Sequence, residues 1–352
     1  MLEALCGQAA PSGFETSVAR TAMELLRTLV DEVYQDRLGN VIGMRRCGRE
    51  GAPLLLLDAH LDEIGLIVTG VEDGFLRFRS IGGVDPRVLV DQEMTVLTEP
   101  PLFGVVSCLP PHVLKAGDSD KAQTIEQLAI DIGLPQEKAE QAVPVGTPVV
   151  CRSQGTALGV SRFCGRALGV SRFCGRALDD RACFAVLLRA AQLLQDTPLD
   201  VDLCLLGSVF EETGGWGAQT AAYGLAPDYC VAVDVTFARS SGVSEEEAPC
   251  KLGGGPAVGV GPIIPRWMSG RFKAKAAQQE IPCQTEILSG RTGTNGDDFQ
   301  TAREGIATAV LSLPLRYMHT PAEVVDLEDM ERTARLLSAF AKDLGKEAEQ
   351  VC

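Results

Sequence analysis

Acidic and imidazole side chains recur at or just beyond the ends of apolar segments in this sequence. Carboxylates gathered beside imidazoles would repel one another unless a cation neutralised them, because an unpaired buried charge costs several kcal/mol. Oxygen and imidazole ligands without thiolates suit Zn²⁺, Co²⁺ or Mn²⁺. The segments are LLLLDAHLDE, RALDDR, GSVFEET, VAVDVT and LRYMHTP, which contribute His60 and Asp62, Asp179, Glu211 and Glu212, Asp234, and His319.

Each of these patterns has a simpler interpretation when taken alone. A single His after a strand is commonly structural, and Glu211-Glu212 would commonly be a solvated turn. Asp179-Asp180 would commonly cap a helix, because Asp is a favoured N-cap residue. Their joint occurrence at strand ends favours a shared site, because ligands of open α/β sheets bind beyond the carboxyl ends of the strands. Two of the three His residues in the chain belong to the set.

The segments that carry these residues predict an α/β fold. VDLCLLGSVF, YCVAVDV and IATAVLSLPL are typical of buried strands, while DRACFAVLLRAAQLLQ and residues 327–347 have helical spacing. Their alternation predicts a mostly parallel sheet flanked by helices. From 65 to 162, short alternating runs broken by Gly and Pro predict a small β-rich domain. We therefore predict a discontinuous α/β domain of residues 1–64 and 163–352, interrupted by an insertion of residues 65–162.

The motifs resemble those of the tetrahedral-aminopeptidase family. These are cytosolic dinuclear-metal peptidases that include glutamyl and deblocking aminopeptidases, and some members were first labelled endoglucanases. The resemblance extends over essentially the whole chain and is carried by DAHLDEIG, ALDDRA, EETGGWGA, AVDVT and LPLRYMHTPAEVV, with APSGFE near the start. It implies a zinc-exopeptidase-like fold with an inserted PDZ-like domain used in assembly. It also implies a cytoplasmic homo-oligomer, commonly a dodecamer, that acts on peptides.

The resemblance further implies a metallo-aminopeptidase that releases N-terminal residues with a metal-bridging water. Two divalent ions would bind each chain, Zn²⁺ first and Co²⁺ or Mn²⁺ as alternatives. Such chemistry needs one carboxylate that bridges the ions and one that stays free to take a proton. The implied roles are His60 and Asp234 on one ion, Glu212 and His319 on the other, Asp179 as the bridge, Glu211 as general base, and Asp62 as the group that orients the His60 imidazole.

Alternative functions remain at this point. A related metallohydrolase acting as a carboxypeptidase or deacylase is disfavoured by the PDZ-like insertion and by YMHTPAEVV. A non-catalytic scaffold is disfavoured because all five ligands and the base are present. The run TGTNGDDFQTA departs from the family pattern, so the preferred N-terminal residue does not follow from the resemblance. Asp297 and Asp298 within that run suggest a basic one.

Composition excludes several partners. The formal net charge of −15 argues against nucleic acid as a partner, because phosphate binding needs a basic face. The start MLEALCGQAAPSGFETSVAR is not typical of a signal peptide. No apolar run approaches the roughly 20 residues that span a bilayer, so we expect no membrane contact. Twelve Cys without CxxC pairs indicate reduced thiols rather than a thiolate metal site.

One segment is an unusual internal copy. Residues 157–166, ALGVSRFCGR, recur without change at 167–176 and lead directly into Asp179. The family pattern is shorter here by about one copy. Because the second copy adjoins Asp179, we expect it to deliver that residue to the sheet. We expect the first copy to be an exposed extension near the domain junction, since insertions in loops cost little closure entropy.

Overall fold

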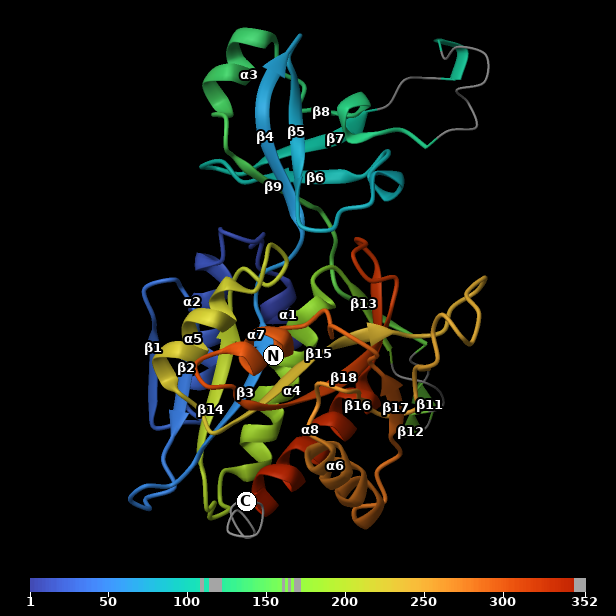
Figure 1. The fold of residues 1–352 in the computed structure, drawn as a ribbon. Helices are drawn as coiled ribbons and strands as arrows, with labels where there is room; N and C mark the ends of the chain where they lie inside the picture. Colours follow the sequence, from blue (N-terminus) through green and yellow to red (C-terminus); the bar gives the residue numbers. More distant parts are fainter. Residues whose placement is uncertain (108–110, 114–121, 160–161, 164–165, 168–171, 345–352) are drawn as a thin grey trace.

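The chain forms a large sheet covered by helices, with a separate β-barrel above it (Figure 1). The computed structural model describes residues 1–107, 111–113, 122–159, 162–163, 166–167 and 172–344. Within those ranges, no helix is long and apolar enough to cross a membrane.

Eleven strands of the described residues make up the large sheet. Its path runs β1-β2-β14-β3-β15-β18-β19-β13-β10, and β16 joins β18 and pairs with β17. The bounds are β1 Glu32–Gln35, β2 Val41–Arg45, β3 Leu54–His60, β10 Thr156–Leu158, β13 Arg172–Gly175, β14 Asp202–Ser208, β15 Tyr229–Phe237, β16 Ala257–Val260, β17 Gln284–Ile287, β18 Ala307–Arg316 and β19 Glu323–Asp326.

The sheet is mixed, so the prediction of a mostly parallel sheet was wrong in its outer parts. Strands β14, β3, β15 and β18 are parallel neighbours, as the strand–helix alternation predicted. Strands β2, β19, β13 and β10 pair antiparallel with their neighbours. The buried apolar runs identify only the central strands, because a strand followed by a short connection returns antiparallel to its neighbour.

Helices cover both faces of the sheet. Side chains alternate between faces along β3: Leu55 and Leu57 face the larger core with α1, α2, α4, α6 and α8, whereas Leu56 faces a smaller core with α5 and α7. The central strands are therefore buried on both sides, which explains their continuous apolar sequence. The bounds are α1 Leu2–Cys6, α2 Thr16–Leu26, α4 Leu178–Leu194, α5 Trp216–Leu225, α6 Arg266–Gln278, α7 Gly296–Thr301 and α8 Leu327–Leu344.

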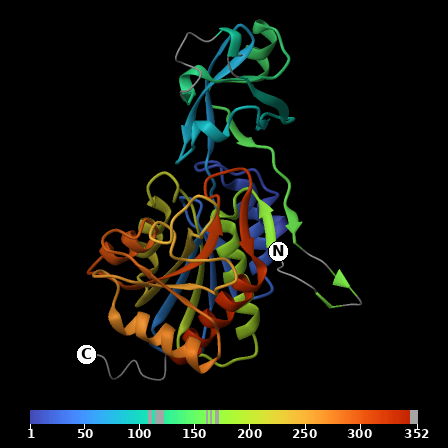
Figure 2. The ribbon, with the colours of Figure 1, turned by 90° about the vertical axis from the view of Figure 1, so that its right-hand side faces the viewer.

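A closed barrel of six antiparallel strands lies between β3 and β10 in the chain and above the sheet in space (Figures 1 and 2). Its order is β4-β5-β8-β7-β6-β9, and Leu66, Leu76, Met94 and Val149 are among the side chains of its own core. The bounds are β4 Gly65–Glu72, β5 Phe75–Ile81, β6 Glu93–Val96, β7 Leu102–Ser107, β8 Ala129–Asp131, β9 Pro148–Cys151 and, outside the strands, α3 Gln136–Ala142.

The duplicated segment begins and ends in one antiparallel pair at the edge of the sheet. Strand β10 includes Ala157 and Leu158 from the first copy and pairs with β13 from the second, with Leu158 opposite Arg172. Phe173 is 4% exposed, whereas Leu158 is 40% exposed. Much of the first copy lies outside the described residues, but its described start belongs to the sheet. The described end of the second copy, residues 172–176, places Phe173 in the core and leads into α4.

Removing one copy should leave the same strand pair with a shorter connection. Deletion of 157–166 yields TALGVSRFCGRALDDR, in which Gly-Val-Ser joins the two strands, and three-residue hairpin loops are common. A shorter loop costs less closure entropy, by about 1 kcal/mol here. We therefore expect kcat/KM within about 2-fold of the parent and a melting temperature that is unchanged or about 2 °C higher. Loss of soluble protein or of activity would refute this account of the repeat.

Candidate metal centre and active site

The predicted site residues converge at the carboxyl ends of the central strands. His60 is the last residue of β3, Asp234 lies within β15, and Glu211 and Glu212 follow the end of β14. Because β14, β3, β15 and β18 are parallel, their carboxyl ends meet at one edge of the sheet. His319 follows β18, and Asp179 is the second residue of α4.

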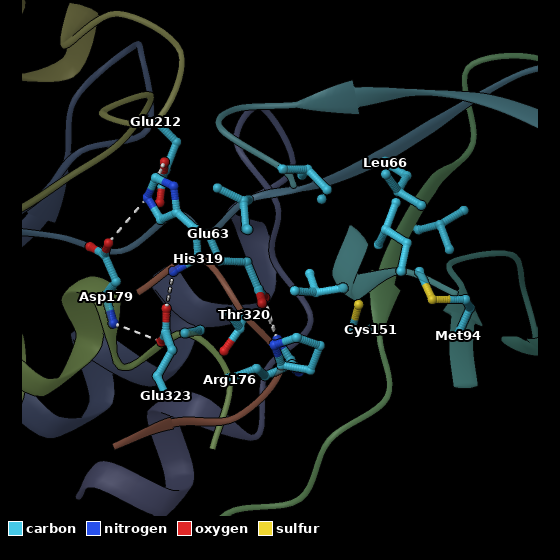
Figure 3. A pocket seen from close by; sticks show the side chains of 18 residues that line it. Glu63, Leu66, Met94, Cys151, Arg176, Asp179, Glu212, His319, Thr320 and Glu323 are labelled. Atoms are coloured by element: carbon cyan, nitrogen blue, oxygen red, sulfur yellow. Dashed lines mark hydrogen bonds and ion pairs between the residues drawn. The ribbon is translucent and has the colours of Figure 1, made fainter. Parts of the chain in front are cut away.

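Asp179 lies between the two histidines. Its Oδ1 is 3.1 Å from Nε2 of His60, and its Oδ2 is 3.3 Å from Nε2 of His319. Nε2 of His319 is also 3.3 Å from Oε2 of Glu212, as Figure 3 shows. Each oxygen of one carboxylate therefore faces a different imidazole, which is the arrangement expected of a bridging ligand.

Two groups of ligand atoms are compact enough to hold an ion. Atoms of His60, Asp179 and Glu212 lie within 4.8 Å of one another, and so do atoms of His60, Asp180 and Asp234. Sequence reasoning assigned a site role to Asp179 but none to Asp180, and so missed the place of Asp180 in the second group. Its Oδ2 accepts a hydrogen bond of 3.2 Å from the His60 backbone N–H, while its buried Oδ1 has no partner. The sequence did contain a signal for the burial of Asp180. Asp180 lies at the start of the long apolar helix α4, and that start is buried.

Crowding and burial shift most carboxyl groups of the site toward their neutral forms, whereas hydrogen bonds from the two histidines outweigh burial and lower the pKa of Asp179. Burial raises the pKa of Glu211 to about 9 and that of Asp234 to about 7, and the neighbouring carboxylates add to both shifts. Burial likewise raises the pKa of Glu212 and, well above its usual range, that of Asp180. Ionising these carboxyl groups together would require a positive charge, and within the described part of the chain no Lys or Arg forms an ion pair with them.

The imidazoles show the same demand for positive charge. Hydrogen bonds to Asp179 and Glu212 raise the pKa of His319 to about 11. Burial opposes protonation of His60, yet hydrogen bonds to Asp179 and Asp62 raise its pKa well above the ordinary value. The surroundings of each imidazole therefore favour a positive charge. Divalent ions bound there would supply that charge in place of the protons. The donor set of imidazole nitrogens and carboxylate oxygens, with the unpartnered Asp180 Oδ1 among them, fits Zn²⁺, Co²⁺ or Mn²⁺.

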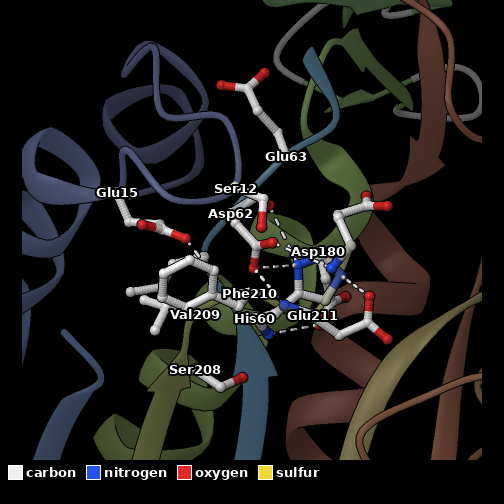
Figure 4. A network of polar contacts seen from close by, with 12 residues as sticks. Ser12, Glu15, His60, Asp62, Glu63, Asp180, Ser208, Val209, Phe210 and Glu211 are labelled. Atoms are coloured by element: carbon white, nitrogen blue, oxygen red, sulfur yellow. Dashed lines mark hydrogen bonds and ion pairs between the residues drawn. The ribbon is translucent and has the colours of Figure 1, made fainter. Parts of the chain in front are cut away.

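Asp62 contacts both the imidazole and the loop that carries the two glutamates. Its Oδ1 is 3.4 Å from Nδ1 of His60, and its backbone carbonyl is 3.2 Å from the same nitrogen. Its carboxylate also accepts 3.1 Å hydrogen bonds from the backbone N–H groups of Glu211 and Glu212 (Figure 4). Asp62 is fully buried. It therefore fixes three site residues, whereas the sequence had suggested only His60.

A second buried carboxylate holds the start of the same loop. Oε1 of Glu15 accepts hydrogen bonds from the N–H groups of Gly13 (2.7 Å) and Phe210 (3.3 Å). Phe210 has a φ of 61°, a left-handed conformation that a bulky residue rarely adopts. Sequence reasoning missed Glu15, although it is the Glu of the quoted motif APSGFE. Glu15 helps to hold the backbone that turns Glu211 toward the site.

The barrel also reaches the site. The carbonyl oxygen of Gly83, in the loop after β5, is 3.1 Å from Nδ1 of His319. A Cβ atom at position 83 would lie 2.8 Å from that nitrogen, so only glycine fits. This contact leaves Nε2 of His319 to face Asp179 and Glu212.

A buried ion-pair network supports the start of α4. Glu63 pairs with Arg176 and Arg181, and Arg181 also donates to the carbonyl oxygens of Leu61 and Ala10. Arg181 is 0% exposed. It therefore has a structural role.

Two cavities adjoin the candidate centre. One, of about 40 Å³, lies between the barrel and the sheet; Asp179, Glu212 and His319 line it at one end and Leu66 and Met94 at the other (Figure 3). The other is an open cavity of about 440 Å³. It is lined by Glu211, Ile263, Arg291, Asp297 and Asp298, among others.

A helix-flanked α/β sheet with a buried cluster of metal ligands at its strand ends defines a metal-dependent hydrolase of the exopeptidase class. The chain belongs to the M42 glutamyl aminopeptidase family, whose model matches residues 39–336. The aminopeptidase activity implied by the sequence motifs is confirmed, as is an α/β fold with a large sheet flanked by helices.

Individual relatives agree with this assignment. The lysyl aminopeptidase of Pyrococcus furiosus is 35% identical over 339 residues, which cover 95% of this chain and 93% of that protein. A solved aminopeptidase structure from the archaeon Desulfurococcus kamchatkensis is 34% identical, with a TM-score of 0.88 over 99% of this chain and 97% of the other. The TET1 peptidase of Pyrococcus horikoshii, described as able to assemble into a tetrahedron or a large octahedral shell, is 29% identical. Its TM-score is 0.81 over 97% of this chain and 98% of its own.

Proposed function

We propose that this aminopeptidase works with two divalent ions per chain, bridged by Asp179. The observation that carries the proposal is the position of Asp179, whose two oxygens face His60 and His319 separately. Zn²⁺ suits the donors best, with Co²⁺ or Mn²⁺ as alternatives. The proposed ligands are His60 and Asp234 for one ion, Glu212 and His319 for the other, and Asp179 for both.

Bound there, the pair of ions supplies an acidified water and stabilises the charge that develops on the scissile carbonyl. Glu211 is the proposed general base, because it is the carboxylate of the strand-end pair that stays outside the ligand set. Burial raises its pKa to about 9, and two dications nearby would oppose that rise. The balance favours a carboxylate that accepts a proton at one step and returns it to the leaving amine at the next.

Asp62 holds the backbone of the proposed base, Glu211, and of its neighbour, Glu212. Because it accepts from the N–H groups of both Glu211 and Glu212, the two side chains leave the backbone from fixed points. One can then bind an ion while the other handles the proton. The free α-amine that distinguishes an N-terminal residue would sit beside the same carboxylates.

Asp298 is the proposed determinant of the preferred N-terminal residue. In the cavity next to Glu211, Asp297 already accepts from the N–H and O–H of Thr292 and the N–H of Gly293. Asp298 accepts from Nε2 of Gln219 and otherwise lines the cavity. We propose that Asp298 favours a basic side chain, which agrees with the name of the Pyrococcus furiosus lysyl aminopeptidase.

Replacing Asp298 by Asn should weaken this preference selectively. A hydrogen bond to a charged group is worth about 1.5–3 kcal/mol, so we expect kcat/KM for Lys-nitroanilide to fall about 10-fold or more. Hydrolysis of Leu-nitroanilide should change by less than about 3-fold. The matched variant is Asp297→Asn, which should affect both substrates equally through the loop. A parent enzyme with no preference for Lys over Glu and Leu removes the proposal.

Assembly and location complete the proposal. We propose a cytoplasmic homo-oligomer, and the description of the Pyrococcus horikoshii relative, which can assemble into a tetrahedron or a large octahedral shell, supports the assembly. A dodecamer is the size that the family resemblance implies. Free cysteines among the described residues agree with a reducing compartment. The barrel of Gly65–Cys151 is the proposed PDZ-like assembly domain, within an insertion of residues 65–162 between catalytic segments 1–64 and 163–352.

The deciding experiment is a panel of aminoacyl-nitroanilides assayed after chelator treatment and again with Zn²⁺, Co²⁺ or Mn²⁺. We expect activity to disappear with the chelator and to return with metal, and bound metal to reach two ions per chain. Release of C-terminal residues from N-terminally blocked peptides would instead indicate a carboxypeptidase, and removal of acyl groups would indicate a deacylase. Metal binding without any hydrolysis would indicate a scaffold.

A further inference from the structure

Glu323 is a buried carboxylate that contacts two proposed ligands without facing the ions. It begins β19 and is 2% exposed. Its Oε1 accepts a 2.9 Å hydrogen bond from the backbone N–H of His319. Its Oε2 accepts from the N–H groups of Leu178 (2.7 Å) and Asp179 (3.1 Å). Figure 3 shows Glu323 between the two ligand-bearing segments.

The segment that carries Asp179 lacks a cap of its own. The backbone is non-helical at Asp179 (φ −75°, ψ 106°) and Asp180 (φ −118°, ψ 23°), so the N–H groups of Leu178 and Asp179 precede the regular part of α4. The preceding residue, Ala177, has no side chain that could accept from them. Glu323 supplies the missing acceptor from another part of the chain.

The segment that carries His319 needs support for a different reason. Tyr317 and His319 have φ values of 62° and 60°, in the left-handed region that non-glycine residues rarely adopt. Such conformations persist where the surroundings enforce them, and they cluster at functional sites. The bond from the His319 N–H to Glu323 and the contact of its ring with Gly83 are the enforcing contacts.

One carboxylate therefore ties together two ligands that are far apart in the chain. The Oδ2 of Asp179 and Nε2 of His319 are 3.3 Å apart, and the backbone N–H groups of both residues donate to the carboxylate of Glu323. Asp62 has the corresponding relation to Glu211 and Glu212 on the other side of the site. Burial and the nearby Asp179 raise the pKa of Glu323 well above its usual range, and the three backbone N–H donors oppose that rise.

We propose that Glu323 is a positioning residue that sets the separation of Asp179 and His319 and thereby the affinity of the ion they share. The inference rests on the proposed dinuclear function. It predicts that disturbing Glu323 weakens the binding of one ion while the other ion still binds. Contacts of this outer kind are typically worth 10–100-fold in metal affinity or activity.

The variant that tests this is Glu323→Gln. It keeps the shape of the side chain but directs an amide NH₂ at N–H groups that need an acceptor. The matched control is Asp329→Asn on the adjoining helix α8. Asp329 is also fully buried and accepts from two backbone N–H groups, those of Gly253 (2.6 Å) and Gly255 (2.7 Å), neither of which is a proposed ligand.

Three measurements are made on the full-length chain. Metal-free protein is titrated with Zn²⁺ and with Co²⁺, and the ions bound are counted after equilibrium dialysis. The melting temperature of the metal-free form is recorded. The values of kcat and KM are determined at low and at high metal concentration.

We expect Glu323→Gln to weaken one of the two ions about 10–100-fold and to lower kcat at limiting metal, with partial recovery at high metal and KM within about 3-fold. Asp329→Asn should lower the melting temperature but leave both affinities unchanged. If Glu323→Gln gives no soluble protein, Glu323→Asp is read by the same titration, since the shorter side chain cannot reach both segments.

Other outcomes overturn the inference. Parent-like affinity for both ions in the Glu323 variant would leave Glu323 with only a structural role, as would an equal loss of metal in Asp329→Asn. A parent protein that binds no metal would overturn the proposed function itself. The parent titration therefore distinguishes the two failures.

Discussion

Replacing Glu211 by Gln is expected to lower kcat about 10³-fold while the protein keeps its fold and its metal. General acid–base groups contribute roughly 10²–10⁴-fold to rate, and Gln cannot take a proton. The backbone of residue 211 is held through its N–H by Asp62, so the isosteric change leaves the loop in place. KM should change little, because the lost function is proton transfer. Steady-state kinetics with Lys- and Leu-nitroanilide test the loss of kcat, and a metal assay on the same preparation tests whether the metal is retained.

The neighbouring residue provides the control. Glu212→Gln removes a proposed ligand that lies 3.3 Å from Nε2 of His319, so it should lose one ion as well as activity. The two variants therefore differ in metal content rather than in rate alone. If Glu211→Gln lost metal and Glu212→Gln kept it, the assignments of base and ligand would have to be exchanged. A Glu211 variant with more than about a tenth of parent kcat would exclude it as the base.

The convergence of ligands was predictable because it depends on topology. Buried apolar runs identify β14, β3, β15 and β18 in the sequence, and parallel strands bring their carboxyl ends together. The sequence alone therefore places three side chains at one edge of the sheet. These are His60, at the end of β3, and the two glutamates after β14. The antiparallel margins were not predictable in this way, since their strands are only three to five residues long. Closure of the barrel was equally hidden, because alternation indicates strands but not the pairing of the last with the first.

The carboxylates that hold the site could not be identified from local sequence. Glu15, Asp180 and Glu323 lie within recognisable motifs, yet each accepts from a backbone N–H that is far away in the chain. Every residue except proline has the same backbone N–H donor. The spacing of residues in the sequence therefore does not show which N–H will donate to a buried carboxylate. The left-handed φ values of Phe210 and His319 are the structural sign that such support is needed. Sequence thus predicts the groups that face the ions better than the groups that hold them.

Replacing Asp179 by Asn is the second change with a large expected effect, because it removes the proposed bridge. Asn offers one oxygen and one NH₂, so one of the two histidines would face a donor in place of a ligand oxygen. We expect bound metal to fall from two ions to one per chain, and kcat/KM to fall by more than about 100-fold, beyond the typical effect of an outer contact. Metal content measured after dialysis and hydrolysis of Leu-nitroanilide test these expectations.

Asp180→Asn is the informative comparison, since Asp180 lies in a ligand group with His60 and Asp234. Its Oδ2 accepts from the His60 N–H, and an Asn oxygen can accept the same bond. The Asp180 variant should therefore keep both ions and lose less activity than the Asp179 variant. The reverse order, with metal lost from Asp180→Asn and kept by Asp179→Asn, would move the bridging role one residue along the chain. That result would also remove the link between Glu323 and the bridge, because Glu323 accepts from the N–H groups of Leu178 and Asp179.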